Sequence, residues 1–124
     1  MKQTEADVQR AIIEALLYDG WMILRVNQGA RNDGQYVRFA WWQCLGTDQQ
    51  DSGISDVIAL KNVEYGGGYF KRLLAVEVKA PGKKKNVTAK QQAFLDAVEE
   101  HGGISIVADC LEDIEPYLER TEVQ

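Results

Sequence analysis

The chain has 124 residues, which is enough for one domain with a single hydrophobic core and leaves no room for a second. Hydrophobic residues make up 45% and charged residues 27%, and no apolar run is long enough to cross a membrane, so the composition indicates a soluble globular protein. The formal net charge of −5 argues mildly against nucleic-acid binding over the whole surface, although a basic patch can still be local.

The first part of the chain predicts a helix, a strand and a loop. Apolar residues at positions 8, 12, 13, 16 and 17 share one face of a helix over 5–19, with Thr4 as N-cap and Gly20 as its stop. The β-rich run WMILRVN follows, and residues 28–35, QGARNDGQ, have loop composition. The aromatic run at 36–45, YVRFAWWQCL, predicts a strand in which Trp41 and Trp42 face opposite sides. We expect one tryptophan in the core and the other exposed, as a wedge or a dimer contact.

The second part predicts a hairpin, a helix and a last strand. DVIAL, a Gly-rich EYGGGY turn and RLLAVEVKA form the hairpin, and a basic loop, APGKKKN, follows it. A helix over 88–101 has Thr88 as N-cap, Gln91 three residues later as in a capping box, and Gly102 as its stop. ISIVADC is an apolar strand, and residues 112–119 allow a short helix that Pro116 limits or kinks. With no repeat or linker, residues 1–124 are expected to form one α/β domain.

The cysteines and the N-terminal residues set two further expectations. Cys44 and Cys110 are far apart and His101 is the sole histidine, too few soft ligands for a zinc site, so we expect both cysteines as buried, reduced thiols. Residues 1–20 carry scattered acids and do not resemble a secretory signal. We therefore expect a chain that starts at Met1 and works in the cytoplasm, of a bacterium or of a phage's host.

The hairpin brings two carboxylates together. If the turn closes on Gly66 and Gly67 as a two-residue loop, the register places Asp56 directly across from Glu77. A three-residue turn or a bulge would shift this pairing by one or two positions and still leave the two acids neighbours. Like charges so placed repel, so a positive group is required between or beside them.

Two chemical interpretations of this pair remain open. Glu77 and Lys79 share one face of their strand, where they could form only an ordinary solvated ion pair. Two carboxylates with a nearby lysine also make a hard-oxygen site that suits Mg²⁺ or Mn²⁺, with Lys79 placed to orient a water or stabilise transition-state charge. The alternative is a structural acid pair that Lys79 and Lys61 neutralise without a metal.

The order of these motifs resembles a known nuclease family. Asp56, twenty intervening residues and Glu77-Val78-Lys79 resemble the PD-(D/E)xK, or restriction-endonuclease-like, superfamily. More narrowly, GISD, EVK and TAKQQAFLDAV in this order resemble the VRR-NUC domain, which occurs in small stand-alone phage and bacterial proteins. The resemblance spans residues 4 to 109 and implies an αβββαβ core with a mixed central sheet. The D…ExK core alone is a weak motif, and its order relative to GISD and the glutamine-containing helix is more specific.

The resemblance implies roles for individual residues. Asp56 and Glu77 would be metal ligands, with the Val78 carbonyl as a third, and Lys79 would be the catalytic lysine. The first helix would add a polar residue near the metal, for which Gln9 is favoured over Glu5, although each could simply be an exposed helix residue. Gln91 matches a glutamine of the family, with either a capping role or one near the active site or DNA.

A basic patch beside the site predicts DNA contacts, although a lysine run is often only a solvated loop. The residues expected to bind DNA are Lys83, Lys84, Lys85, Lys90 and Gln91, with Arg31 and Arg38 as further contacts. The chain departs from the family's Val-Arg-Arg at Val107-Ala108-Asp109, so any role of those arginines is lost or supplied elsewhere.

The resemblance implies a DNA endonuclease that uses Mg²⁺ or Mn²⁺ and needs neither a membrane nor a small organic cofactor. Small stand-alone members resemble Holliday-junction resolvases. Because two symmetric cuts need two active sites, we expect branched DNA as the partner and a homodimer that meets through 36–45 or through apolar helix surfaces. The alternatives are a flap or restriction-type nuclease of the same fold and a non-catalytic DNA-binding module.

Overall fold

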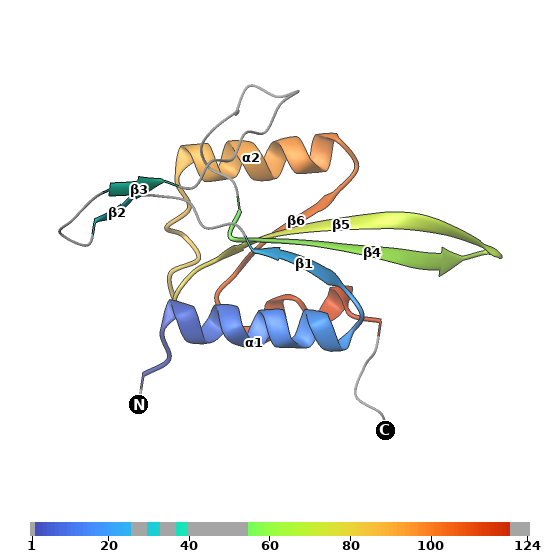
Figure 1. The fold of residues 1–124 in the computed structure, drawn as a ribbon, viewed down its shortest axis with the longest axis horizontal. Helices are drawn as coiled ribbons and strands as arrows, with labels where there is room; N and C mark the ends of the chain where they lie inside the picture. Colours follow the sequence, from blue (N-terminus) through green and yellow to red (C-terminus); the bar gives the residue numbers. More distant parts are fainter. Residues whose placement is uncertain (1, 26–29, 33–36, 40–54, 120–124) are drawn as a thin grey trace.

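The computed structural model describes residues 2–25, 30–32, 37–39 and 55–119, which form two helices, a four-stranded sheet and a small ribbon (Figure 1). The order along the chain is α1 (Glu5–Tyr18), β1 (Met22–Arg25), β2 (Ala30–Asn32), β3 (Val37–Phe39), β4 (Val57–Tyr65), β5 (Gly68–Val78), α2 (Ala89–Glu100) and β6 (Ile104–Ala108). Two 3₁₀ helices, η1 (Leu111–Asp113) and η2 (Glu115–Tyr117), follow.

The central sheet has the strand order β1-β4-β5-β6, and only its β5–β6 pair is parallel. Helix α2 connects those two parallel strands. The succession α1, β1, β4, β5, α2, β6 is therefore the predicted αβββαβ core with a mixed sheet. Strands β2 and β3 pair only with each other among the described residues and form a separate ribbon.

Both helices begin at the predicted N-caps. The Thr4 hydroxyl accepts the Asp7 N–H at 3.1 Å while the Asp7 carboxylate accepts the Thr4 N–H at 2.9 Å, which completes a capping box. Thr88 and Gln91 form the same arrangement at the start of α2. Because caps satisfy the free N–H groups of the first turn, the sequence located these helix starts correctly.

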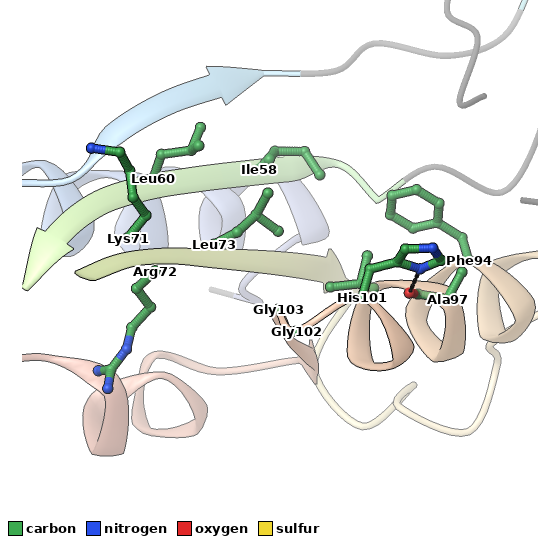
Figure 2. Close-up of a pocket in the computed structure, with 11 residues that line it drawn as sticks. Ile58, Leu60, Lys71, Arg72, Leu73, Phe94, Ala97, His101, Gly102 and Gly103 are labelled. Atoms are coloured by element: carbon green, nitrogen blue, oxygen red, sulfur yellow. Dashed lines mark hydrogen bonds between the residues drawn. The ribbon is translucent and has the colours of Figure 1, made fainter. Parts of the chain in front are cut away.

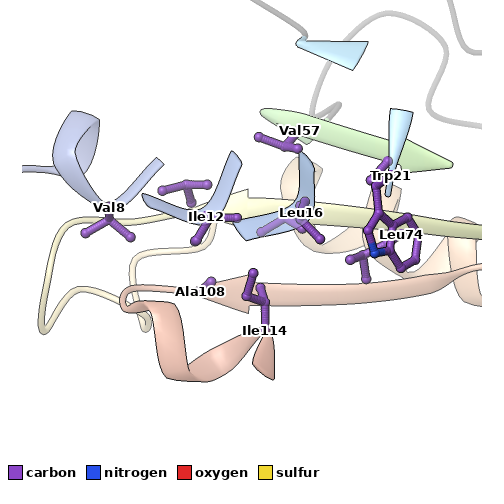
Figure 3. Close-up of a cluster of buried hydrophobic side chains, with 11 residues drawn as sticks. Val8, Ile12, Leu16, Trp21, Val57, Leu74, Ala108 and Ile114 are labelled. Atoms are coloured by element: carbon purple, nitrogen blue, oxygen red, sulfur yellow. The ribbon is translucent and has the colours of Figure 1, made fainter. Parts of the chain in front are cut away.

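The two faces of the sheet are covered by different helices. Helix α1 packs its buried side chains against Val57, Leu74 and Val76, in a cluster that also includes Ile114 (Figure 3). On the other face, Ala75 of β5 packs with Phe94 and Leu95 of α2. Because side chains alternate along β5, Glu77 lies on the face of α2. Figure 1 shows that the first turns of α1 and α2 both lie at the end of the sheet where β5 finishes.

Two predictions of local structure were wrong. Residues 28–35 were expected to be loop, but Ala30–Asn32 form β2, because pairing with β3 outweighs the weak local preference. Residues 112–119 were expected to form a short α-helix and instead contribute to η1 and η2. Pro116 has no N–H to continue an α-helical ladder, and short 3₁₀ turns do not need one there.

Several predictions concern the segment from 36 to 45, of which the structure describes only Val37–Phe39, as β3. Trp41, Trp42 and Cys44 lie outside the described residues, as does most of the expected dimer contact. No helix in the described part of the chain is long and apolar enough to span a membrane.

A buried carboxylate holds the end of the described chain against the sheet. Asp19 is 1% exposed, and its Oδ2 accepts from Trp21 Nε1 at 2.9 Å, Lys61 Nζ at 2.9 Å and Glu119 N–H at 3.0 Å. Lys61 also lies 3.2 Å from the Glu119 carboxylate. One interpretation of the sequence had Lys61 neutralising Asp56 and Glu77. The structure excludes this, because Lys61 lies five residues from Asp56 along β4, roughly 17 Å away.

Candidate active site

The observed hairpin register confirms the two-residue turn. Tyr65 pairs with Gly68, and the pairing continues to Val57 with Val76, so Asp56, one position further, lies opposite Glu77. Gly66 and Gly67 both have positive φ, at 60° and 84°, as a two-residue hairpin turn of this type requires. The Asp56 Oδ2 accepts the N–H of Val78 at 3.0 Å, which ties the residue before β4 to the end of β5.

Glu77 is a buried acid with an incomplete set of partners. Its side chain is 3% exposed, its Oε2 accepts from Gln91 Nε2 at 2.9 Å, and its Oε1 has no hydrogen-bond partner among the described residues. Desolvation and the neighbouring Asp56 raise the pKa of Glu77 to about 8, against the opposing effect of Lys79. Without a further cation, this carboxyl is therefore mostly protonated at neutral pH.

Gln91 connects the acid to the lysine. Its Oε1 accepts from Lys79 Nζ at 3.0 Å and from the Thr88 N–H at 3.0 Å, while its Nε2 donates to Glu77. Lys79 Nζ itself lies 3.7 Å from Glu77 Oε2. One Gln91 side chain thus both caps α2 and contacts the acid of the candidate site.

Helix α1 brings Glu5 toward the pair. The charge of Glu5 is among the effects that raise the pKa of Glu77, although it is the smallest of them. Gln9, favoured from the sequence, is half-buried one turn later, and its side chain forms no hydrogen bond with another described residue. Of these two residues, Glu5 is the one whose charge affects Glu77 in the described part of the chain.

The predicted DNA-binding lysines are not equivalent. Lys83, Lys85 and Lys90 are exposed and form no salt bridge with any described residue. Lys84 Nζ lies 2.7 Å from an oxygen of Asp113 and 3.9 Å from one of Asp109. Arg31 is in β2 and pairs with Arg38 across the ribbon.

A second polar cluster follows β6 and was missed by the sequence analysis. Asp109, Cys110 and Asp113 offer ligand atoms that lie within 4.8 Å of one another, and the close spacing of these residues after an apolar strand was the available signal. Lys84 already supplies this cluster with a positive charge. Desolvation raises the pKa of the Cys110 thiol, which is free and half-buried rather than buried as predicted, so it is a poor metal ligand.

The acid pair is better suited to a cation than this cluster. The carboxylates of Asp56 and Glu77 are hard oxygen donors, and the buried Glu77 Oε1 lacks a partner that a metal ion would supply. Lys79 does not by itself neutralise the pair, since the pKa of Glu77 remains raised beside it. The donor set therefore fits Mg²⁺ or Mn²⁺.

A pocket of about 430 Å³ lies apart from these carboxylates (Figure 2). Its floor is apolar, with Ile58, Leu60, Leu73 and Phe94, and it opens beside the last turn of α2, where His101 Nδ1 lies 2.8 Å from the Ala97 carbonyl. None of its described lining residues is an acid. The catalytic candidates are therefore at the opposite end of α2 from this pocket.

Comparison with known proteins supports one family. The VRR-NUC domain family matches residues 3–110, which include every element from α1 to β6. Neither the curated proteins nor the solved structures that were searched include a match to this chain.

Proposed function

The chain belongs to the VRR-NUC domain family, a nuclease family of the restriction-endonuclease-like superfamily, and we propose that it is a metal-dependent DNA endonuclease whose active site contains Asp56, Glu77 and Lys79. One observation carries this proposal: the hairpin register sets two carboxylates opposite each other at the end of the sheet, with Lys79 3.7 Å from the second. The family match makes nuclease chemistry the natural use of such an arrangement.

The residues that would hold Mg²⁺ or Mn²⁺ are Asp56, Glu77 and the carbonyl of Val78. A bound ion of this kind acts as a Lewis acid toward phosphate oxygen and lowers the pKa of a bound water. Glu77 would have to give up its proton to become a ligand, because its pKa of about 8 keeps it largely neutral otherwise. Glu5 or Gln9 of α1 would contribute a further polar group.

Lys79 would stabilise negative charge on the phosphate as the bond breaks, because its ammonium is held beside the carboxylates by the Gln91 amide at 3.0 Å. The first turns of α1 and α2 lie at the same end of the sheet, and the positive ends of the two helix dipoles favour an anion there. These features support a phosphate at this end of the molecule.

The phosphate backbone on either side of the cut would bind to the exposed lysines of the loop and of α2. Lys83, Lys85 and Lys90 are close in sequence to Lys79 and carry no salt bridge to the described residues. Arg31 and Gln91 complete the proposed set, whereas Lys84, also expected from the sequence, already has two carboxylate partners. This local basic surface would allow a protein of net charge −5 to bind DNA, with divalent ions reducing the remaining repulsion.

The preferred substrate would be branched DNA such as a four-way junction, cut by a homodimer in the cytoplasm. The described residues of one chain contain one such acid pair, and two symmetric cuts need two. Leu17 and Tyr18 are 54% and 74% exposed at the end of α1, and they are the described apolar helix surface available for such a contact.

The deciding experiment incubates purified protein with a four-way junction, a flap, a duplex and a single strand of matched sequence, with Mg²⁺, Mn²⁺ or EDTA. We expect ion-dependent cleavage of the junction, lost in Glu77→Gln and lowered about 10² to 10³-fold in Lys79→Ala, with both variants folded. Glu100→Gln, which removes an exposed acid far from the site, is the matched control. Cleavage of the flap or duplex alone would point to the alternative nuclease types, and binding without cleavage of any substrate would point to a non-catalytic module.

A further inference from the structure

The loop between β5 and α2 is attached by two aspartates to the segment that runs from the end of β6 to the end of η1. Asp109 Oδ2 accepts the N–H of Gly82 at 2.9 Å, and Asp113 Oδ1 binds Lys84 Nζ at 2.7 Å. The two acids are themselves connected, because Asp113 Oδ2 accepts the Asp109 N–H at 3.0 Å. We refer to Asp109, Asp113 and Lys84 as the loop anchor.

The two acids of the loop anchor are more shielded from water than those of a typical surface ion pair, while the Lys84 side chain is half-exposed. The side chains of Asp109 and Asp113 are only 17% and 20% exposed, and the contact between Lys84 and Asp113 is a short charge-assisted hydrogen bond. Desolvation raises the pKa of Asp113, but hydrogen bonds from Lys84, the Asp109 N–H and Cys110 outweigh it and leave that pKa below its ordinary value. The same hydrogen bond to Asp113 raises the pKa of Lys84.

The three consecutive lysines of this loop consequently differ in their available charge. Lys84 has two carboxylates within 4.0 Å, so a phosphate would have to compete with both of them. Lys83 and Lys85 are exposed and have no acidic partner among the described residues. Their backbone is also ordered, since the Lys83 N–H donates to Ala80 O and the Lys83 carbonyl accepts from the Asn86 N–H, each at 2.9 Å.

We propose that Asp109 and Asp113 are positioning residues for the DNA interface. They hold the loop so that Lys83 and Lys85 bind phosphate, while Lys84 stabilises the loop through its contact with Asp113. The phosphate part of this inference rests on the proposed nuclease function. Asp109 stands in the segment where the chain departs from Val-Arg-Arg, and an arginine there could neither accept the Gly82 N–H nor attract Lys84.

The first test measures how junction binding depends on salt. Lys83→Met, Lys84→Met and Lys85→Met are built on the Glu77→Gln background, so that no cleavage interferes and each variant keeps an aliphatic stem. We expect the slope of log K against log salt to fall by roughly 0.9 for the variants at 83 and 85. We expect no change for the variant at 84. An equal loss of slope in Lys84→Met would overturn the assignment.

The second test does not require DNA. In Asp109→Ala, amide hydrogen exchange of Gly82 should become about fivefold faster, whereas Asp109→Asn, which keeps an acceptor oxygen, should stay near the original rate. In the active background, Asp109→Ala should raise KM for the junction about threefold to tenfold with kcat unchanged, and Asp109→Asn should restore it.

The outcomes separate the two proposals. Unchanged Gly82 exchange in Asp109→Ala, with normal DNA binding, would overturn the loop anchor and leave the nuclease function standing. Absence of DNA binding by the whole series would overturn the nuclease function and the phosphate assignment, while the exchange measurement would still decide whether Asp109 holds the loop. If Asp109→Ala does not fold, Asp113→Ala replaces it, with faster exchange of the Asp109 N–H as the expected result because its acceptor is removed.

Discussion

Asp56 and Glu77 face each other across the end of the β4–β5 hairpin, and the residue after Glu77 donates its N–H to Asp56 at 3.0 Å. The two acids come from strands that are paired over nine residues, so their separation is fixed by the sheet. An acid pair of this kind stores an electrostatic cost that a proton or a cation removes. Both the proton and the cation lead to measurable expectations.

The stability of the metal-free protein should fall as pH rises from about 4.5 to about 8. The pKa of Glu77 is raised from 4.5 to about 8 by burial and by Asp56, so the folded state keeps a proton that the unfolded state has lost. The stabilising contribution is fully present below pH 4.5 and is lost as pH rises through 8. Urea unfolding in EDTA at several pH values measures this slope, which Glu77→Gln should remove. An unchanged slope in the variant would assign the effect to other groups.

Binding of Mg²⁺ or Mn²⁺ should be weak below neutral pH and stronger above it. The ion competes with the proton of Glu77, so binding releases that proton and the melting temperature should rise more with added ion at pH 8.5 than at pH 6. Asp56→Asn should abolish this shift. Asp113→Asn should preserve it, and the reverse pattern would mean that the ion binds beside Cys110 instead.

Gln91→Glu should separate capping from catalysis. A glutamate at this position still caps α2, so the unfolding free energy should change by less than about 1 kcal/mol. It cannot donate to Glu77, and it adds a negative charge between Glu77 and Lys79, so kcat should fall at least about tenfold. Thr88→Ala is the complementary variant, which should cost stability of about 1 kcal/mol and spare kcat. Equal activity of Gln91→Glu and the original protein would remove Gln91 from the active site.

Asp19→Ala should destabilise the fold without altering the chemistry. It removes the acceptor shared by Trp21, Lys61 and the Glu119 N–H. Lys61, whose side chain is 12% exposed, keeps Glu119 as its one acidic partner among the described residues. Loss of one partner of a buried ion pair costs about 3 kcal/mol or more. Urea unfolding measures this loss, and kcat below the unfolding transition should remain unchanged. Glu14→Ala, on the exposed side of the same helix, is the control.

Features that depend on neighbouring residues were predictable from the sequence. Local sequence of a few residues determines the caps at Thr4 and Thr88 and the Gly66-Gly67 turn. The turn then sets the strand register from Tyr65 to Asp56. This worked because antiparallel pairing propagates a register without further information. The residue pattern alone allowed either a metal site or a structural acid pair, and the family resemblance favoured the metal site.

Features that depend on the crossover were not predictable in the same way. Lys84 and Asp113 are 29 residues apart and meet only because α2 returns the chain to a strand beside β5. Lys61 and Asp19 are separated by 42 residues and meet because β1, which follows Asp19, pairs with β4. A lysine in a sequence shows its charge but not its partner, so Lys61 was placed with the wrong acid and Lys84 was grouped with Lys83 and Lys85.

The two-glycine turn also constrains how the length of this hairpin can vary between related proteins. One residue added to a single arm, between the turn and the acids, would shift the pairing of β4 with β5 and change the residue opposite Asp56, although neither acid had changed. Two residues, one added to each arm beside the turn, would lengthen the hairpin and leave the acid pair in place. Insertions and deletions in the arms should therefore come in even numbers, unless a three-residue turn or a β-bulge takes up an odd one.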